Sequence, residues 1–247
     1  MDLQVTLNSF ATDVFRRQAD HDYISARSNY RMALRQQFLW SAHQAVEKYL
    51  KAILLFNGLS ARYPTILTSK KKEFGHDLNA LHAEVKTVTV LHYELEPKDH
   101  DFLSYLSSQG GNNRYLSVSA HMAPDAMHRL DRLVWSVRRY CRYIPDCGLN
   151  CTKTTPGMRD AIIRSINSPT KKSSPHTYAL IGGELEQVIA RSPNDPARKA
   201  LLWANLFYGT KKRTRATFDA FSSMEIPPHE REYNDIDRNV LERFIRL

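Results

Sequence analysis

The sequence predicts an all-α fold, a helical bundle followed by a helical extension. Along most of the chain, apolar residues recur at intervals of three or four, which is the spacing of a helix that buries one side. Prolines and glycines interrupt this pattern where helix ends are expected. Strand-like alternation gives one short candidate, at residues 86–93. These observations place the chain in the all-α class.

The helix expected over residues 38–58 has the clearest pattern. Its apolar stripe comprises Leu34, Phe38, Ala42, Ala45, Val46, Tyr49, Ile53 and Phe56. Polar residues occupy the other side, where Glu47 precedes Lys51 by four residues in the orientation that favours an ion pair. Gly58 stands where a left-handed C-terminal cap is expected. An earlier helix over residues 7–30 is expected to pack against this one as an antiparallel hairpin.

The same periodicity predicts three further helices that complete a bundle, at residues 76–88, 97–106 and 124–143. A loop is expected at residues 59–75, and the polar double-glycine stretch SSQGGNN at residues 107–113 predicts a loop without regular structure. Pro97 at the first helical position favours a helix start there.

Composition changes at residue 146, where Cys, Thr, Ser, Pro and Gly become frequent. We therefore expect a helical bundle over residues 1–145, and a linker with a helical C-terminal extension over residues 146–247. The helices expected in the extension are residues 157–166, 176–191, 195–208 and 235–246.

The charge balance indicates the kind of partner. The 247 residues carry a net charge of +9, and an excess of that size favours polyanions such as RNA or DNA. Basic residues cluster at Lys70, Lys71 and Lys72, at Arg138, Arg139 and Arg142, and at Lys211, Lys212, Arg213 and Arg215. The simpler interpretation of each cluster, and the favoured one, is a solvated face or loop. No long uncharged apolar run or secretory signal is evident, so we expect a cytoplasmic protein without a membrane partner.

The cysteines argue against a metal site. Cys141, Cys147 and Cys151 have spacings that fit neither paired zinc knuckles nor a disulfide framework. We expect free thiols, no metal and no cofactor.

One combination of residues carries a family resemblance. The first helix contains Ala19, Asp22 and Ala26, the second reads AHQAVEKYLKAILLFNG from residue 42, and GHDLNAL follows from residue 75. Over residues 8–145 the chain resembles the HEPN domain, an all-α family associated with nucleic acids. The matching residues are Ala42, Ala45, Glu47, Lys48, Leu50, Lys51, Ala52, Gly58, His76, Asp77, Leu78 and Leu81.

The resemblance implies an up-and-down bundle that forms a homodimer, with a cleft at the dimer interface. Many members are metal-independent endoribonucleases, often toxins encoded beside a nucleotidyltransferase-type antitoxin. Their motif is an Arg and a polar residue followed by a His at the start of the last long helix. The His is the general base on the ribose 2′-hydroxyl, and the Arg stabilises the phosphate.

Arg114 and His121 have the spacing of this motif and are the catalytic candidates that the resemblance implies. Tyr115 follows Arg114 where the family has Asn, Asp or His, and Pro124 follows His121. The segment NNRYLS is similar to the Arg-Tyr turn of non-catalytic members. Asn112, Asn113 and Tyr115 are candidate nucleic-acid contacts together with Lys211, Lys212, Arg213 and Arg215. The simpler alternative is that Arg114 binds loop carbonyls and His121 is an exposed residue before the helix.

Basic and aromatic residues also mix in the extension, from Arg198 and Lys199 through Trp203, Asn205 and Tyr208 to Arg215. Such a mixture suits nucleic-acid binding, but packing of the aromatic side chains against the bundle is the favoured interpretation. Taken together, the sequence predicts a HEPN-like protein that binds or cleaves RNA. The alternative is a non-catalytic module that binds a nucleotide or a partner protein.

Overall fold

A computed structural model describes residues 3–65, 73–111, 120–143, 156–167, 183–205, 208 and 224–226. The regular secondary structure of these residues is almost entirely helical, which confirms the predicted all-α class. The exception is one short antiparallel pair, β1 (Ala120–Met122) with β2 (Met224–Ile226), in which His121 stands opposite Glu225. Within the described residues, no helix is both long enough and apolar enough to cross a membrane.

The hairpin at the N-terminal end of the chain is the centre of the fold. Its first arm is continuous from α1 (Leu3–Phe10) through the π-helical turn η1 (Ala11–Arg16) to α2 (Arg17–Arg31), and its second arm is α3 (Arg35–Phe56). Ala33 makes the turn between α2 and α3 in a left-handed conformation, with φ of 63°. Gly58 is also left-handed, with φ of 72°, and the N–H of Leu59 donates to the carbonyl of Leu54. The predicted cap is therefore present.

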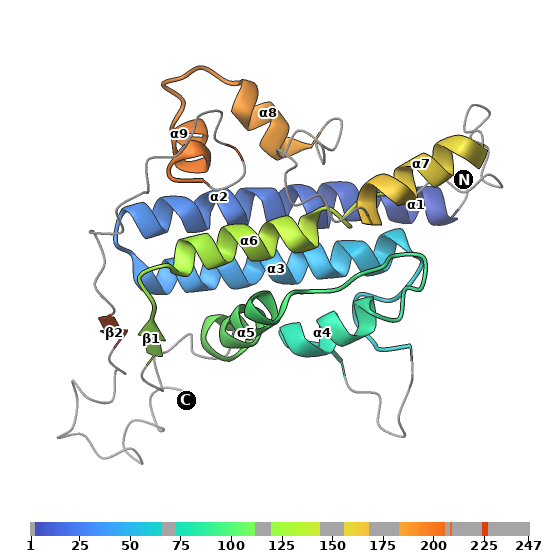
Figure 1. Cartoon of the computed structure of the whole chain (residues 1–247), viewed down its shortest axis with the longest axis horizontal. Coiled ribbons are helices and arrows are strands. Elements are labelled where there is room, and N and C mark those ends of the chain that lie inside the picture. The colour runs from blue at the N-terminus through green and yellow to red at the C-terminus, as the bar shows by residue number, and fades with distance from the viewer. Residues whose placement is uncertain are drawn as a thin grey trace, which may run out of the picture.

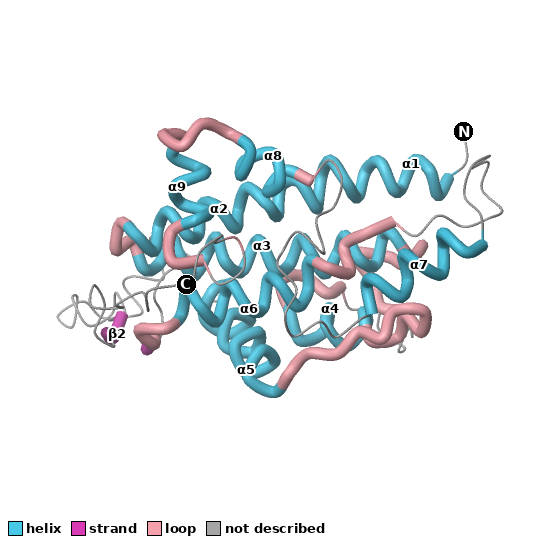
Figure 2. Tube along the Cα trace, turned by 45° about the horizontal axis from the view of Figure 1, so that its top comes forward, coloured by secondary structure: helices cyan, strands magenta, loops and turns pink. Residues whose placement is uncertain are grey.

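The remaining elements flank this hairpin (Figure 1). They are α4 (Leu78–Val85), α5 (Pro97–Leu106), the π-helical turn η2 (Ser107–Gly111), α6 (Ala126–Arg138), α7 (Pro156–Asn167), α8 (Glu184–Ala190) and α9 (Pro196–Leu202). In both views α8 and α9 lie beside α2, whereas α4 and α5 lie beside α3 on the other side of the hairpin (Figures 1 and 2).

Two local predictions were wrong. Residues 86–93 form no strand: turns follow α4, and the chain then runs extended with Leu91, Tyr93 and Leu95 buried and His92 and Glu94 exposed. Alternate burial against the bundle therefore produces the strand-like pattern without a pairing partner. The stretch SSQGGNN was expected to lack regular structure, but its first five residues continue α5 as η2.

The C-terminal helices are attached to the bundle by buried charges. The Arg138 guanidinium on α6 donates to Asp20 on α2, with Nε to Oδ1 at 2.8 Å, and to Glu186 on α8, with Nη1 to Oε1 at 3.0 Å. Arg138 and Asp20 are both buried. Within the basic cluster at residues 138–142, Arg138 is therefore not on a solvated face. Its partner is the carboxylate of Asp20, 118 residues away in the sequence.

A second buried arginine connects α2 to α9. Arg27 is completely inaccessible to solvent; it forms an ion pair with Asp131 on α6, and its Nε donates to the carbonyl of Ala200 at 3.0 Å. The same guanidinium donates to the carbonyl of Trp203. Residues 183–205 therefore pack on the bundle and provide acceptors for two of its buried cations.

Candidate functional site

Of the residues predicted to form the site, the structure describes only the backbone of His121, on β1. The others lie outside the described residues: Asn112, Asn113, Arg114, Tyr115, Lys211, Lys212, Arg213 and Arg215. What the structure does define is how the two ends of the connection between α5 and α6 are held.

The first end of this connection packs tightly on α3. A β-carbon added at Gly110 would lie 2.7 Å from the Cβ of His43 and 2.7 Å from the carbonyl oxygen of Leu39. Ser107, at the start of η2, accepts a hydrogen bond from the N–H of Leu78 at 3.1 Å. Because only a glycine fits against α3 at residue 110, the position of η2 is fixed just before Asn112.

The second end is held at the turn between α2 and α3. Met122 on β1 is buried, and the Tyr30 hydroxyl at the end of α2 donates to the carbonyl of Pro124 at 2.5 Å. Burial raises the pKa of Tyr30 to about 12, so this hydroxyl keeps its proton. In Figure 1, β1 lies below the end of the bundle where α2 and α3 meet. The described residues that come before and after residues 112–119 are thus attached to the same hairpin.

His121 does not lie on α6. It is paired with Glu225 on β1, and α6 begins only at Ala126. Two residues seven apart share one face only on an unbroken helix. The arrangement in which Arg114 and His121 project from one helical face is therefore excluded.

A polar stripe on α3 lies beside the first attachment. His43, Glu47 and Lys51 follow one another at intervals of four, and Glu47 is buried although the sequence suggested a surface pair. Its Oε1 accepts from Nζ of Lys51 at 2.6 Å, and its Oε2 lies 3.0 Å from Nδ1 of His76. Burial raises the pKa of Glu47, but the hydrogen bonds from Lys51 and His76 outweigh it and bring the pKa below its ordinary value. Glu47 is therefore a carboxylate at neutral pH.

This stripe is continuous with the connection, since Gly110 of η2 packs against His43. Arg114 follows Gly110 by four residues, a span of at most about 14 Å of extended chain. Sequence reasoning did not assign His76 to this cluster, because its carboxylate partner is 29 residues away. The repeat of His43, Glu47 and Lys51 at intervals of four was the available signal.

The aromatic residues of the extension are used for packing, as the favoured interpretation held. The Trp203 ring lies 6.2 Å from that of Tyr30, and the guanidinium of Arg31 lies 5.2 Å from the Trp203 ring centre. Asn205 and Tyr208 are buried. These contacts cover part of the Trp203 ring, and the Tyr208 ring is buried and not available to stack on bases.

Within the described residues, no three His, Cys, Asp or Glu side chains are grouped so as to hold a metal ion. Cys141 is a buried free thiol that donates to the carbonyl of Tyr49 at 3.2 Å. Cys147 and Cys151 lie outside the described residues.

Comparison with protein-family models identifies a family for most of the bundle. The family model of the HEPN domain matches residues 12–141, which extend from η1 to just beyond α6 and exclude the C-terminal helices. No curated protein and no solved structure matches the chain.

Proposed function

The chain belongs to the HEPN family, and we propose that it acts on RNA through the connection between α5 and α6. Arg114 binds the phosphate in this proposal, and His121 transfers the proton. A second copy of the chain completes the cleft, and a nucleotidyltransferase-type antitoxin is the partner that the family relationship suggests. The net charge of +9 favours a polyanionic substrate.

The proposed reaction needs no metal. His121 takes the proton from a ribose 2′-hydroxyl, and the 2′ oxygen attacks the neighbouring phosphorus. The bond from phosphorus to the 5′ oxygen breaks, and that oxygen takes up a proton from water. The products are a 2′,3′-cyclic phosphate and a 5′-hydroxyl end. The guanidinium of Arg114 stabilises the charge that develops on the phosphate oxygens, because its fork of N–H groups matches two of them.

The observation that carries the proposal is the anchoring of the connection. Gly110 is wedged against α3, and Pro124 is held by Tyr30 of α2. The described residues before and after the motif are thus held on the hairpin, and η2 contacts His43, one turn before the ionised Glu47 on α3. Catalysis requires reacting groups held in a defined geometry, and a fold that holds both ends of the connection is compatible with that requirement.

A non-catalytic binding module is the second candidate, and one observation favours it. His121 is part of β1 and is followed by Pro124, so α6 does not align it with Arg114. In that case the connection recognises RNA, a nucleotide or a protein without cutting it.

RNA cleavage in EDTA separates the two candidates. Wild type is compared with His121→Ala and Arg114→Ala, and the matched controls are His21→Ala on α2 and Arg164→Ala on α7, both exposed. If the protein is catalytic, the cleavage rate is expected to fall by about 100-fold or more in both site variants, the scale of general acid–base effects, and to stay unchanged in both controls. Salt-dependent binding without cleavage by pure wild type would support the binding module. If wild type neither binds nor cleaves RNA, the proposal fails.

A further inference from the structure

A separate hollow of about 480 Å³ lies between α4 and α5, on the side of the bundle away from α8 and α9. On the side of α4 the lining residues fall at intervals of three and four and include Asn79 and His82, with Lys86 directly after the helix. On α5 they include His100 and Asp101. The hollow has the volume of a small-molecule site, and none of its residues belongs to the connection between α5 and α6.

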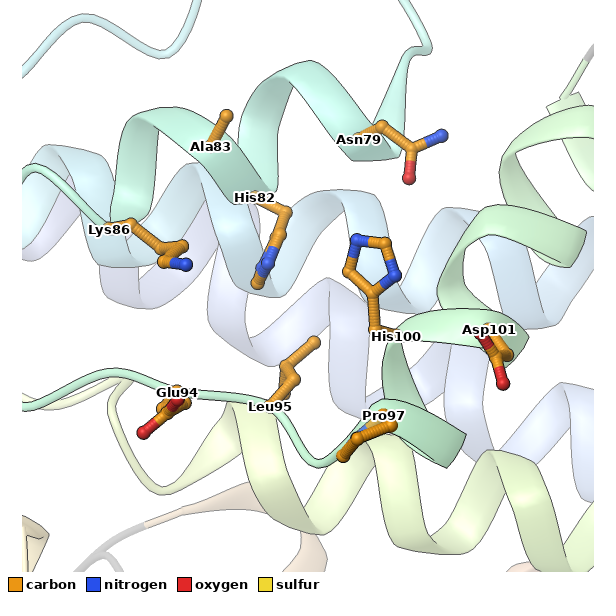
Figure 3. Close-up of a pocket in the computed structure, with 9 residues that line it drawn as sticks. All are labelled: Asn79, His82, Ala83, Lys86, Glu94, Leu95, Pro97, His100 and Asp101. Carbon is orange, nitrogen blue, oxygen red and sulfur yellow. The ribbon is translucent and has the colours of Figure 1, made fainter.

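Two imidazoles face each other across the hollow. Figure 3 shows the His100 ring rising from α5 toward α4 and the His82 ring descending from α4 beside it. The ring centres are 5.4 Å apart. His82 is 7% exposed, whereas His100 is exposed. The pair therefore has one fixed, buried member and one member that solvent reaches.

Tyr93 fixes the proton arrangement of His82. Its hydroxyl lies 3.1 Å from Nδ1 of His82, and burial raises the pKa of Tyr93 well above its ordinary value, so the hydroxyl stays protonated. A buried hydroxyl whose hydrogen bond is unmade is costly, which favours donation from Tyr93 to Nδ1. Neutral His82 then carries its own proton on Nε2. It lines the hollow as a hydrogen-bond donor.

The charged groups that line the hollow act differently on His82. The pKa of His82 is lowered to about 4, mainly by burial and also by the nearby His100 and Lys86. No carboxylate offsets this effect, although Glu94 and Asp101 also line the hollow. Figure 3 shows the reason: the carboxylates of Glu94 and Asp101 point outward at the margins, whereas the Lys86 amine turns toward His82.

We propose that the hollow between α4 and α5 binds a phosphomonoester group, held by Lys86, His82 and His100. Lys86 supplies a positive charge, His82 a fixed N–H donor, and His100 a second imidazole N–H donor. Phosphate oxygens can accept hydrogen bonds from all three side chains. The group belongs either to a small phosphorylated molecule or to the end of an RNA strand. The site is independent of the proposed cleavage site, so each can fail without the other.

Imidazole NMR signals provide the first test, with inorganic phosphate titrated into the full chain at constant ionic strength. The His82 and His100 signals, identified by their loss in His82→Asn and His100→Gln, are expected to shift with saturation at a millimolar Kd or below. Lys86→Gln is expected to weaken binding tenfold or more. Lys98→Gln is the matched control, because Lys98 is an exposed lysine on α5 outside the hollow.

Two results would overturn the proposal: shifts of His82 and His100 that do not saturate, or equal weakening by Lys86→Gln and Lys98→Gln. Lys86 is exposed, so its replacement leaves the fold intact and keeps the test decisive even if His82→Asn is unstable. A short RNA with and without a 5′-phosphate identifies the source of the group. Binding of the phosphorylated strand tighter than inorganic phosphate assigns an RNA end, and equal or weaker binding assigns a small molecule.

Discussion

Replacing Arg138 with methionine tests whether the buried ion pairs hold the fold together. The guanidinium makes two hydrogen bonds to Asp20, with Nε to Oδ1 at 2.8 Å and Nη2 to Oδ2 at 3.0 Å. It makes two more to Glu186, both at 3.0 Å. Methionine fills much of the same volume but leaves Asp20, which is inaccessible to solvent, as a buried carboxylate without a cation.

The structure sets the magnitude of the effect. The Tyr49 hydroxyl still donates to Asp20 at 2.6 Å, and the Glu186 side chain, 21% exposed, regains water. The uncompensated charge of Asp20 therefore dominates, and breaking such a buried pair costs about 3–5 kcal/mol of unfolding free energy. For a chain of this size, that loss lowers Tm by about 6–20 °C.

Urea denaturation followed by circular dichroism measures this effect. Arg191→Met is the matched control, because Arg191 pairs with Glu184 at 3.0 Å with its side chain 44% exposed. A surface pair of that kind contributes about 1 kcal/mol or less. Adding Asp20→Asn to Arg138→Met is expected to recover part of the loss, since the buried charge is then absent. Equal losses in the two single variants would refute the reasoning.

Three other predictions follow from the packing. Gly110→Ala, which forces a β-carbon against His43, is expected to lower the free energy of unfolding by about 1–3 kcal/mol. Its control is Gly157→Ala on α7, where no atom lies within 4 Å of the new carbon, and this change is expected to be neutral or to add up to about 1 kcal/mol. Urea denaturation compares the two variants, and equal destabilisation would contradict the close contact at Gly110. The pKa of His82 is lowered to about 4 in the folded protein, so the unfolded chain binds a proton at a higher pH than the folded chain does. The contribution of neutral His82 to the free energy of unfolding is therefore complete above about pH 6.5 and is smaller by about 1–2 kcal/mol near pH 5. His82→Asn is expected to lack that part of the pH dependence, and parallel curves for variant and wild type would count against it. Burial raises the pKa of the Cys141 thiol far above its ordinary value, so peptide mapping after alkylation of the native protein is expected to find Cys141 unmodified until the protein unfolds.

The sequence was sufficient for the apolar half of the fold. In α3 the predicted stripe from Phe38 to Phe56 is buried, as its interval of three or four residues indicates. Residues outside the stripe, among them Leu39, Leu50 and Leu54, are buried as well, so the core covers more of α3 than the stripe predicts. Leu34 is the exception, at 44% exposed. It falls in the turn where Ala33 adopts a left-handed conformation, so the helical periodicity no longer applies to it.

The polar half could not be predicted in the same way. The position of a charged residue in the sequence indicates its neighbours on the same helix, but not the partner that the fold brings to it from another element. Arg138 was grouped with a basic run, yet it neutralises Asp20, and the buried Glu47 contacts His76. For such residues, burial is decided by partners from other elements, which periodicity does not encode.

The same reasoning applies to the candidate site and to the division of the chain. The Arg114 to His121 spacing identified a connection, but the attachment of its ends depends on the fit of Gly110 on α3, which spacing does not express.

The predicted division at residue 146 likewise stays a prediction, and the buried arginines limit how independent the two parts are. Arg27 depends on the carbonyl of Ala200 for a hydrogen bond, so a bundle without the extension would bury that donor with fewer acceptors or expose it to water. The family match ends at residue 141, so in this chain hydrogen bonds from outside the matched region complete the polar interior of a HEPN bundle.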